Sequence, residues 1–162
     1  MKLILVLMLF LIINSQAETM PKSFSGTLYV IINNEGQTES LWGVEKLKKA
    51  MKGNITNIET VCTYINGKQE GPKVGYFNYS KGLISSFQNY KAGKKHGKSI
   101  HYWSDGKNYA EGTFKNGKKW SGTFPIYMMT IGDDGRSTTF NGVTLQTFKD
   151  GKEIETPEKK TP

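Results

Sequence analysis

The stretch "YKAGKKHGKSIHYWSDGKNYAEGTFKNGKKWSG", residues 90–122, holds the pattern that decides the fold. It contains two similar phrases, "YKAGKKHG" and "FKNGKKWSG", and each has an aromatic residue three positions before a glycine that is followed directly by lysine. The phrase also occurs outside the stretch, and its aromatic residues are Tyr64, Tyr90, Phe114 and Phe148. A short phrase repeated along a chain indicates a repeat architecture, in which each unit packs on its neighbours.

The repeats are rich in hairpin-turn signals. Asn-Gly and Asp-Gly pairs favour two-residue type I′ turns, because both central residues of such a turn need a positive φ. These pairs are Asn66-Gly67, Asp105-Gly106, Asn116-Gly117, Asp134-Gly135, Asn141-Gly142 and Asp150-Gly151. The segments between them are short and rich in aromatic and β-branched residues, so the sequence predicts an antiparallel sheet.

Strict alternation within these segments predicts which side chains share a face. "SIHYW" places Ile100 and Tyr102 on one face and His101 and Trp103 on the other. In "YAEGTFK", Ala110, Gly112 and Phe114 share a face, and Tyr109, Glu111 and Thr113 lie opposite them.

A single segment has helical spacing. Ser40 is the predicted N-cap, Glu45 to Met51 the helical run and Gly53 the stop. The preceding "GTLYVIINNEG" is typical of a strand closed by a turn. "ETVCTY" also alternates like a strand, with Cys62 on the same face as Tyr64. Cys62 is the only cysteine, so no intrachain disulfide can form, and we expect a buried side chain rather than a reactive thiol.

The N-terminus has the order of a secretory signal peptide. Lys2 precedes an unbroken apolar run, Leu3 to Ile13, and small residues follow at Ser15 and Ala17. The alternative is a membrane anchor, but this run is much shorter than the roughly 20 residues needed to span a bilayer. We therefore expect cleavage after Ala17, no transmembrane anchor after processing, and a secreted or periplasmic protein.

Four regions follow from these patterns. They are the signal peptide (residues 1–17), an N-terminal strand and helix segment that can cap the array (18–63), the hairpin repeats (64–155) and a tail (156–162). The tail, "TPEKKTP", has no large apolar side chains to bury in a core, and its composition is typical of disorder.

Basic charge is concentrated in the repeats. The chain has 22 basic and 14 acidic residues, so loss of Lys2 leaves 21 − 14 = +7. Residues 64–124 alone hold eleven lysines against Glu70, Asp105 and Glu111, a net charge of +8. A one-sided field of this kind concentrates anionic partners, although the same lysines could serve only solubility.

Residues 90–122 resemble the bacterial variant of the MORN repeat, found in proteins loosely labelled YwqK-type antitoxins. The resemblance weakens over residues 64–82 and is marginal after Phe124, where "FPIYMMTIGDDGRSTTFNGVTL" interrupts the period. It implies a mainly β fold of stacked antiparallel β-hairpins in an elongated, twisted sheet, here with one short N-terminal helix. Glycine, lysine and aromatic residues make up its motifs, so they specify a fold more than an activity.

Stacking would align equivalent lysines and aromatic residues into one basic, aromatic stripe. Its predicted members are Lys94, Lys95, Lys98, Tyr102, Trp103, Lys118, Lys119 and Trp120. Such a stripe suits an anionic glycan, phospholipid headgroups or an acidic protein, whereas export argues against nucleic acid. The alternative is that the aromatic residues fill the core and the lysines prevent edge-to-edge aggregation.

Catalytic chemistry has weaker support. His96 and His101 would need a carboxylate to orient them, and Asp105 and Glu111 are the only neighbours in sequence. His96 occupies a repeat position that is Glu70 or Trp120 elsewhere, which indicates a turn residue. No zinc-ligand spacing is present, and we expect no metal or cofactor.

Three functions remain open from the sequence. The first is an exported, non-enzymatic β-repeat protein that acts as a binding or scaffold module for an anionic surface or a protein partner. The second, which rests on the family label, is an antitoxin or immunity-type inhibitor of a toxin. The third is a small hydrolase that uses His96 or His101.

Overall fold

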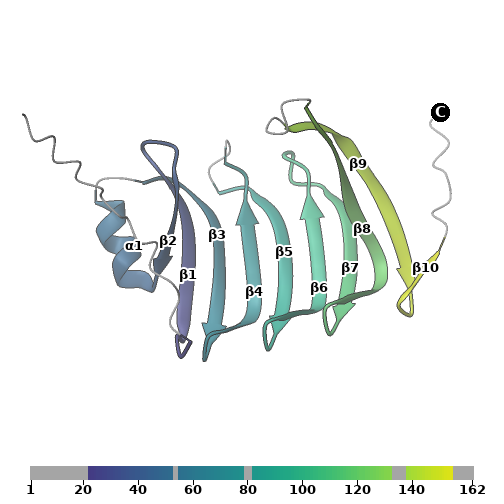
Figure 1. Ribbon diagram of the computed structural model, residues 1–162, viewed down its shortest axis with the longest axis horizontal. Helices are drawn as coiled ribbons and strands as arrows, with labels where there is room; N and C mark the ends of the chain where they lie inside the picture. The colour runs from purple at the N-terminus through teal and green to yellow at the C-terminus, as the bar shows by residue number, and fades with distance from the viewer. Residues whose placement is uncertain (1–21, 53–54, 79–81, 133–137, 155–162) are drawn as a thin grey trace, which may run out of the picture.

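The computed structural model describes residues 22–52, 55–78, 82–132 and 138–154. Within these residues, ten strands form one antiparallel sheet, and a single helix lies beside its N-terminal end (Figure 1). The elements are β1 (Gly26–Asn33), β2 (Thr38–Trp42), α1 (Val44–Met51), β3 (Ile55–Ile65), β4 (Lys68–Tyr76), β5 (Ile84–Lys91), β6 (Lys94–Tyr102), β7 (Asn108–Lys115), β8 (Lys118–Ile131), β9 (Thr138–Lys149) and β10 (Lys152–Ile154). The structure confirms the predicted fold class. The predicted signal peptide and the tail lie outside the described residues.

The strand order follows the chain almost throughout. It runs β10-β9-β8-β7-β6-β5-β4-β3-β1-β2, so every strand from β3 onward pairs with its neighbours in sequence. Only the β1–β2 hairpin departs from this order, because β3 pairs with β1 and β2 becomes the outermost strand. β3 is a continuous strand that runs through residue 63, so the N-terminal segment and the repeats share one sheet.

Four turns of the same type lie in a row along one margin of this sheet, where the strands end. Their central residues have φ values of 48° and 70° at Asn66-Gly67, 50° and 81° at Ala92-Gly93, 52° and 88° at Asn116-Gly117, and 50° and 78° at Asp150-Gly151. Positive φ at both positions is the signature of a type I′ turn. Three of the turns predicted from Asn-Gly and Asp-Gly are therefore confirmed, and an Ala-Gly pair forms the fourth.

Each turn is hydrogen-bonded to its neighbour in the row: the first to the segment just before β1, and the other three to the preceding hairpin. The glycine N–H groups donate to backbone oxygens as follows: Gly67 to Phe24 at 2.8 Å, Gly93 to Gln69 at 2.9 Å, Gly117 to Lys95 at 2.8 Å and Gly151 to Trp120 at 2.8 Å. The preceding turn residue is also held in three cases: Asn66 N–H by Ser25 Oγ, Ala92 N–H by Glu70 Oε2 and Asn116 N–H by His96 Nδ1. These bonds keep the turns in line along the edge.

Two other predicted turns differ from expectation. At Asp105-Gly106 only the glycine has a positive φ, and the wider loop closes through a Trp103 N–H bond to Lys107 O of 2.8 Å. The predicted turn at Asn141-Gly142 is wrong. Both residues lie inside β9, where Gly142 pairs with Met128 next to a register shift. Asp134-Gly135 lies outside the described residues.

The helix forms where the sequence predicts it, but its predicted cap is wrong. Ser40 belongs to β2 and pairs with Val30, so it cannot cap α1. Gly43 precedes the helix, with φ of 87° and no side-chain cap. Leu47 is the buried residue of α1. Gly53, the predicted stop, lies outside the described residues.

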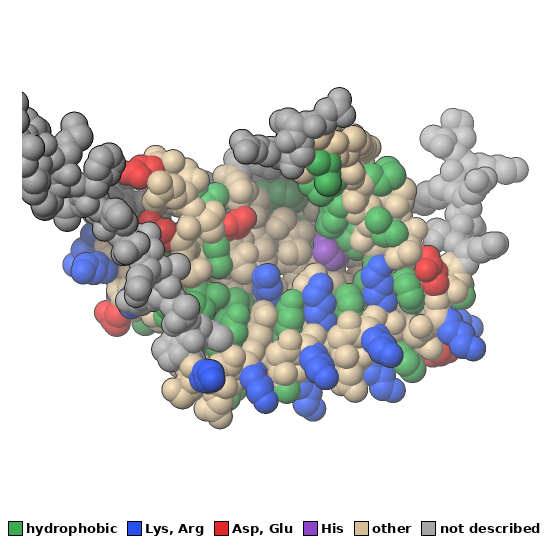
Figure 2. All heavy atoms as spheres, in the orientation of Figure 1, with side chains coloured by type: hydrophobic (Ala, Val, Ile, Leu, Met, Phe, Trp, Pro, Cys, Tyr) green, Lys and Arg blue, Asp and Glu red, His purple; other side chains and the backbone are tan. Residues whose placement is uncertain are grey.

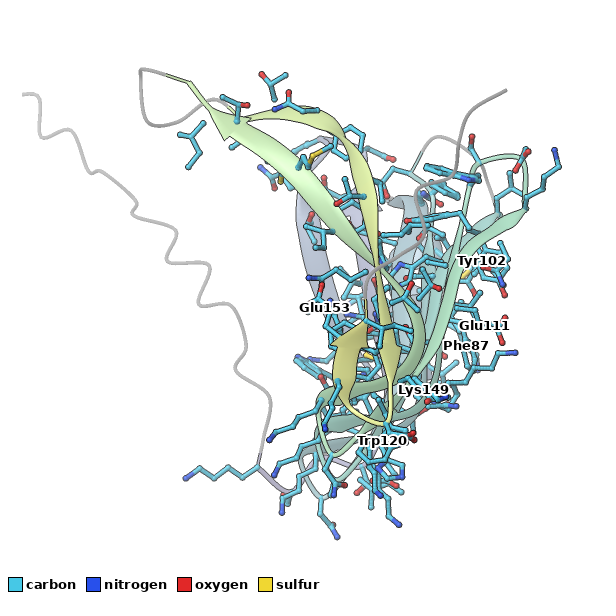
Figure 3. The ribbon with its side chains drawn as sticks, turned by 90° about the vertical axis from the view of Figure 1, so that its right-hand side faces the viewer. Phe87, Tyr102, Glu111, Trp120, Lys149 and Glu153 are labelled. Atoms are coloured by element: carbon cyan, nitrogen blue, oxygen red, sulfur yellow. The ribbon has the colours of Figure 1, made fainter. Side chains whose placement is uncertain are left out.

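Strand pairing assigns side chains to the two faces of the sheet, because residues directly opposite each other in an antiparallel pair share a face. We call the face toward the reader in Figure 1 the front face. Figure 3 shows Glu153 on the front side and Phe87, Tyr102 and Glu111 on the back. Phe148 pairs with Glu153 and therefore lies on the front face.

The main packing on the front face is aromatic. Near the C-terminal end, Phe124 is only 2% exposed and makes edge contacts with Phe114 and Phe148, with ring centroids 4.9 and 5.7 Å apart. Phe24, Trp42 and Tyr64 form a second cluster at the other end of the sheet. These contacts give the single-layer sheet its core, together with buried residues such as Leu28, Ile31 and Cys62.

A bulge overturns one predicted alternation. The register of β6 and β7 shifts between His101 and Tyr102. His101 pairs with Ala110 and Tyr102 pairs with Asn108, so Tyr109 is an extra residue with no partner in β6. Tyr109 therefore turns toward His101, with ring centroids 6.0 Å apart, rather than lying on the opposite face.

Candidate functional site

Lysines flank the four type I′ turns. A two-residue turn places the residues on either side of it directly opposite each other. In three successive turns both flanking residues are lysine: Lys91 pairs with Lys94, Lys115 with Lys118, and Lys149 with Lys152. The first turn has Ile65 opposite Lys68. We call these seven exposed lysines the lysine edge.

The lysine edge is a straight, regular feature. Each hairpin contributes two strands, and strands lie about 4.8 Å apart, so the lysine pairs repeat about every 10 Å. Figure 2 shows basic side chains gathered along this lower margin of the molecule and on the adjoining front face.

A second group of lysines lies on the front face next to the edge. Lys95 pairs with Tyr90 and Lys119 with Phe114, while Lys73 lies one row further up, opposite Cys62 and Gln88. We call Lys73, Lys95 and Lys119 the front row. Lys95 is partly buried, and its pKa is lowered by this burial and then by the neighbouring charges of Lys73 and Lys119.

Aromatic rings, rather than carboxylates, contact the ammonium groups of Lys95 and Lys119. Lys95 Nζ lies 5.1 Å from the centroid of Phe114, and Lys119 Nζ lies 5.4 and 5.2 Å from those of Phe124 and Phe148. Lys119 also donates to Gln146 Oε1 at 2.7 Å. In the part of the chain that the structure describes, no lysine of the edge or the front row forms an ion pair, whereas Lys48, Lys98 and Lys107 do. The charges of the edge and the front row are therefore uncompensated.

The structure brings together five residues of the predicted stripe and separates three. Lys94 and Lys118 belong to the lysine edge, and Lys95 and Lys119 to the front row. Trp120 lies with them, because Lys115 Nζ sits 4.3 Å from its ring centroid.

The other three stripe residues point elsewhere. Lys98 is paired with Glu111 at 3.0 Å on the back face, where Figure 3 also shows Tyr102. Trp103 stacks on Tyr109 at the opposite end of β6, with centroids 4.1 Å apart. Alternation along β6 explains the first two, because Lys98 and Tyr102 stand an odd number of residues after Lys95 and so lie on the opposite face. Trp103 follows the end of β6 that lies away from the turns.

Sequence reasoning missed several members of this surface: Lys68, Lys73, Lys91, Lys115, Lys149 and Lys152. Most had a readable signal, since Lys-Xaa-Gly-Lys occurs three times and a type I′ turn sets its two lysines side by side. Lys73 had none, because its place depends on the register of β4 against β3 and β5.

His101 lies in a pocket of about 340 Å³ under the upper part of β8 and β9. Its Nδ1 is 3.3 Å from Tyr127 Oη, which is 2.9 Å from Tyr109 Oη. Burial, followed by the charge of Lys95, lowers the pKa of His101. Serine and aromatic side chains such as Ser86, Phe140 and Tyr109 line the pocket, and no carboxylate is among its lining residues.

His96 and Cys62 have structural surroundings. His96 Nδ1 accepts the Asn116 N–H at 3.4 Å, which is the turn-holding role that Glu70 has one hairpin earlier. Cys62 is buried as expected, and this burial raises the pKa of its thiol. No group of three metal-binding side chains occurs among residues that the structure describes.

Comparison of the chain with protein-family models, curated proteins and solved structures finds no match. Among the described residues, the helix is too short and too polar to cross a membrane.

Proposed function

We propose that this protein is an exported, non-enzymatic binding module whose lysine edge and front row hold an anionic glycan. One observation carries the proposal: three successive turns present a lysine on each side, in line, with no carboxylate paired to them in the described part of the chain.

The arrangement favours a linear ligand. Lysine pairs repeat about every 10 Å along one edge of a single-layer sheet, which makes a narrow strip rather than a broad platform. A polymer that carries regularly spaced negative groups can lie along such a strip and meet each pair in turn. Aromatic rings beside the ammonium groups, such as Phe114 and Trp120, offer apolar faces on which sugar rings can pack.

Electrostatic attraction of this kind acts before contact. Uncompensated charges of one sign raise the local concentration of an oppositely charged ligand and speed its association. The pKa of Lys95 is lowered first by its burial and then by repulsion from the charges of Lys73 and Lys119. A bound sulfate or carboxylate would relieve that repulsion.

The hydrolase alternative has little to support it. His101 hydrogen-bonds to tyrosine in its pocket, and no carboxylate lines that pocket to orient the imidazole. An acidic protein, including a toxin, would meet the same lysine edge. The antitoxin alternative therefore competes for the same surface, without an observation of its own.

The proposal is tested by sedimenting the mature protein with a sulfated glycan and, separately, with vesicles of anionic phospholipid, at low and high salt. We expect binding to the glycan at low salt and a steep loss as salt rises, because exposed charges are screened. Stronger binding to the vesicles would identify a membrane surface, and not a glycan, as the ligand of the lysine edge. Absence of binding to either at low salt would leave the lysines a role in solubility alone.

A further inference from the structure

The upper part of the β8–β9 hairpin differs in chemistry from the rest of the protein. Residues 123–132 and 138–147 include no Lys, Arg, Asp or Glu, although the chain as a whole is strongly basic. Several large apolar side chains in these ranges are exposed: Met129, Ile131 and Phe140 are 59, 66 and 58% exposed, and Ile126, Tyr127 and Met128 are between 37 and 49% exposed. An apolar cluster of this size on a soluble domain is typical of an interaction site.

The same hairpin has an open backbone edge. β10 pairs with β9 only at residues 147–149. Over residues 138–144, β9 has β8 on one side and no strand on the other within the described part of the chain. Alternate residues of such a strand direct their N–H and C=O groups outward, where another strand can bond to them.

Nothing in this segment protects the edge. Natural edge strands are shielded by lysine, proline, inward-pointing charge or a short length, and residues 138–144 of β9 have no charge and no proline. At the opposite end of the sheet, β2 is short, carries the exposed Glu39 and has α1 beside it. The β2 end of the sheet therefore has features that discourage pairing with a further strand, and residues 138–144 of β9 lack them.

We propose that this edge pairs with the same edge of a second copy of the chain, in an antiparallel dimer about a two-fold axis perpendicular to the sheet. An antiparallel pair of identical strands is self-complementary, as a two-fold interface requires. Charge favours this occupant, because residues 123–132 and 138–147 of the hairpin carry no charge although the protein as a whole is basic. Two copies can meet here without opposing like charges.

The dimer would have a defined geometry. The axis rotates the second copy by 180° within the plane of the sheet. The front faces of both copies then lie on the same side of the dimer, and their two lysine edges lie at opposite margins. A dimer would then carry two separate lysine edges, so a polyanion that engaged both would gain from bivalency.

The test measures the mass of the mature protein in solution by light scattering and sedimentation across a wide concentration range. Wild type should have twice the mass of one chain. The variant Thr139→Lys/Thr144→Lys places two charges on the open edge, at exposed positions, and should be monomeric. A matched control, Ile65→Lys/Leu83→Lys, adds the same charge at exposed apolar positions on other strands or loops and should remain dimeric.

Three outcomes would overturn the dimer. They are a monomeric wild type at the highest concentration, a dimer that persists in the edge variant, or a monomer whose exposed hairpin binds uncharged phospholipid vesicles. Circular dichroism melts of each variant separate a lost interface from a lost fold. Because mass is measured without ligand, the result does not depend on glycan binding.

Discussion

Ala92 adopts a backbone conformation that disfavours alanine. Its φ is 50°, in a type I′ turn whose equivalents elsewhere in the array are asparagine or aspartate. A left-handed conformation costs an ordinary L-residue about 1–2 kcal/mol, whereas asparagine adopts it more readily because its side chain can bond locally. The turn forms nonetheless, because Gly93 N–H bonds to Gln69 O and Glu70 accepts the Ala92 N–H. Tertiary bonds therefore override the local preference here.

The substitution Ala92→Asn should stabilise the protein by about 1 kcal/mol, because it removes this strain and leaves the backbone bonds in place. The reverse change at the equivalent turn, Asn116→Ala, should destabilise it by a similar amount. Urea unfolding of both variants beside wild type measures the two changes. Equal stability of all three proteins would show that the turns are not of the type described.

At the scale of elements, the β7–β8 pair depends on two glycines that let strands approach closely. Gly112 pairs with Gly122, and a Cβ on Gly112 would lie 2.4 Å from the Phe124 ring. Gly122 has φ of 99°, and a Cβ there would lie 2.4 Å from Glu111 O and 2.5 Å from Gly112 Cα. Backbone atoms cannot move aside as a side chain can. The array passes from regular repeats to the longer β8–β9 hairpin at this point.

Gly122→Ala should therefore destabilise the protein by about 3 kcal/mol or more, through backbone strain and a clash with the neighbouring strand. Gly117→Ala is the control, because Gly117 also has a positive φ of 88° but has nothing within 4 Å of an added Cβ. It should cost only about 1–2 kcal/mol. Thermal unfolding distinguishes the variants, and a smaller loss at Gly122 than at Gly117 would contradict the close packing.

The elements themselves were largely predictable, but their registers were not. Asn-Gly and Asp-Gly located three of the edge turns, since only a few residue types tolerate their φ values. The same signal failed at Asn141-Gly142, where pairing with β8 outweighs local turn preference. Bulges such as the one that turns Tyr109 toward His101 depend on which residues meet across strands. Alternation within a single strand cannot reveal them.

At the scale of the whole molecule, the fold and the proposed binding surface come from the same repetition. Each hairpin contributes a turn, each turn places a lysine pair, and hydrogen bonds between hairpins line these pairs along one edge. A single-layer sheet has little interior, so most of its side chains remain at a surface. Four of the ten lysines in the edge and the front row were predicted from the repeated phrase: Lys94, Lys95, Lys118 and Lys119. The separation of Lys98, Tyr102 and Trp103 from this surface follows from alternation along β6 and from the length of that strand.

The most direct measurement of the central claim compares two variants that lose the same charge in different places. One carries Gln at Lys94, Lys95, Lys118 and Lys119, and the other carries Gln at four lysines in or next to α1: Lys46, Lys48, Lys49 and Lys52. At about 1 kcal/mol for each lysine near an anionic surface, the first variant should bind a sulfated glycan about a thousandfold more weakly than wild type at low salt. The second should bind nearly as wild type does. Equal losses in the two variants, or an unchanged affinity in the first, would contradict the assignment of binding to the lysine edge and front row.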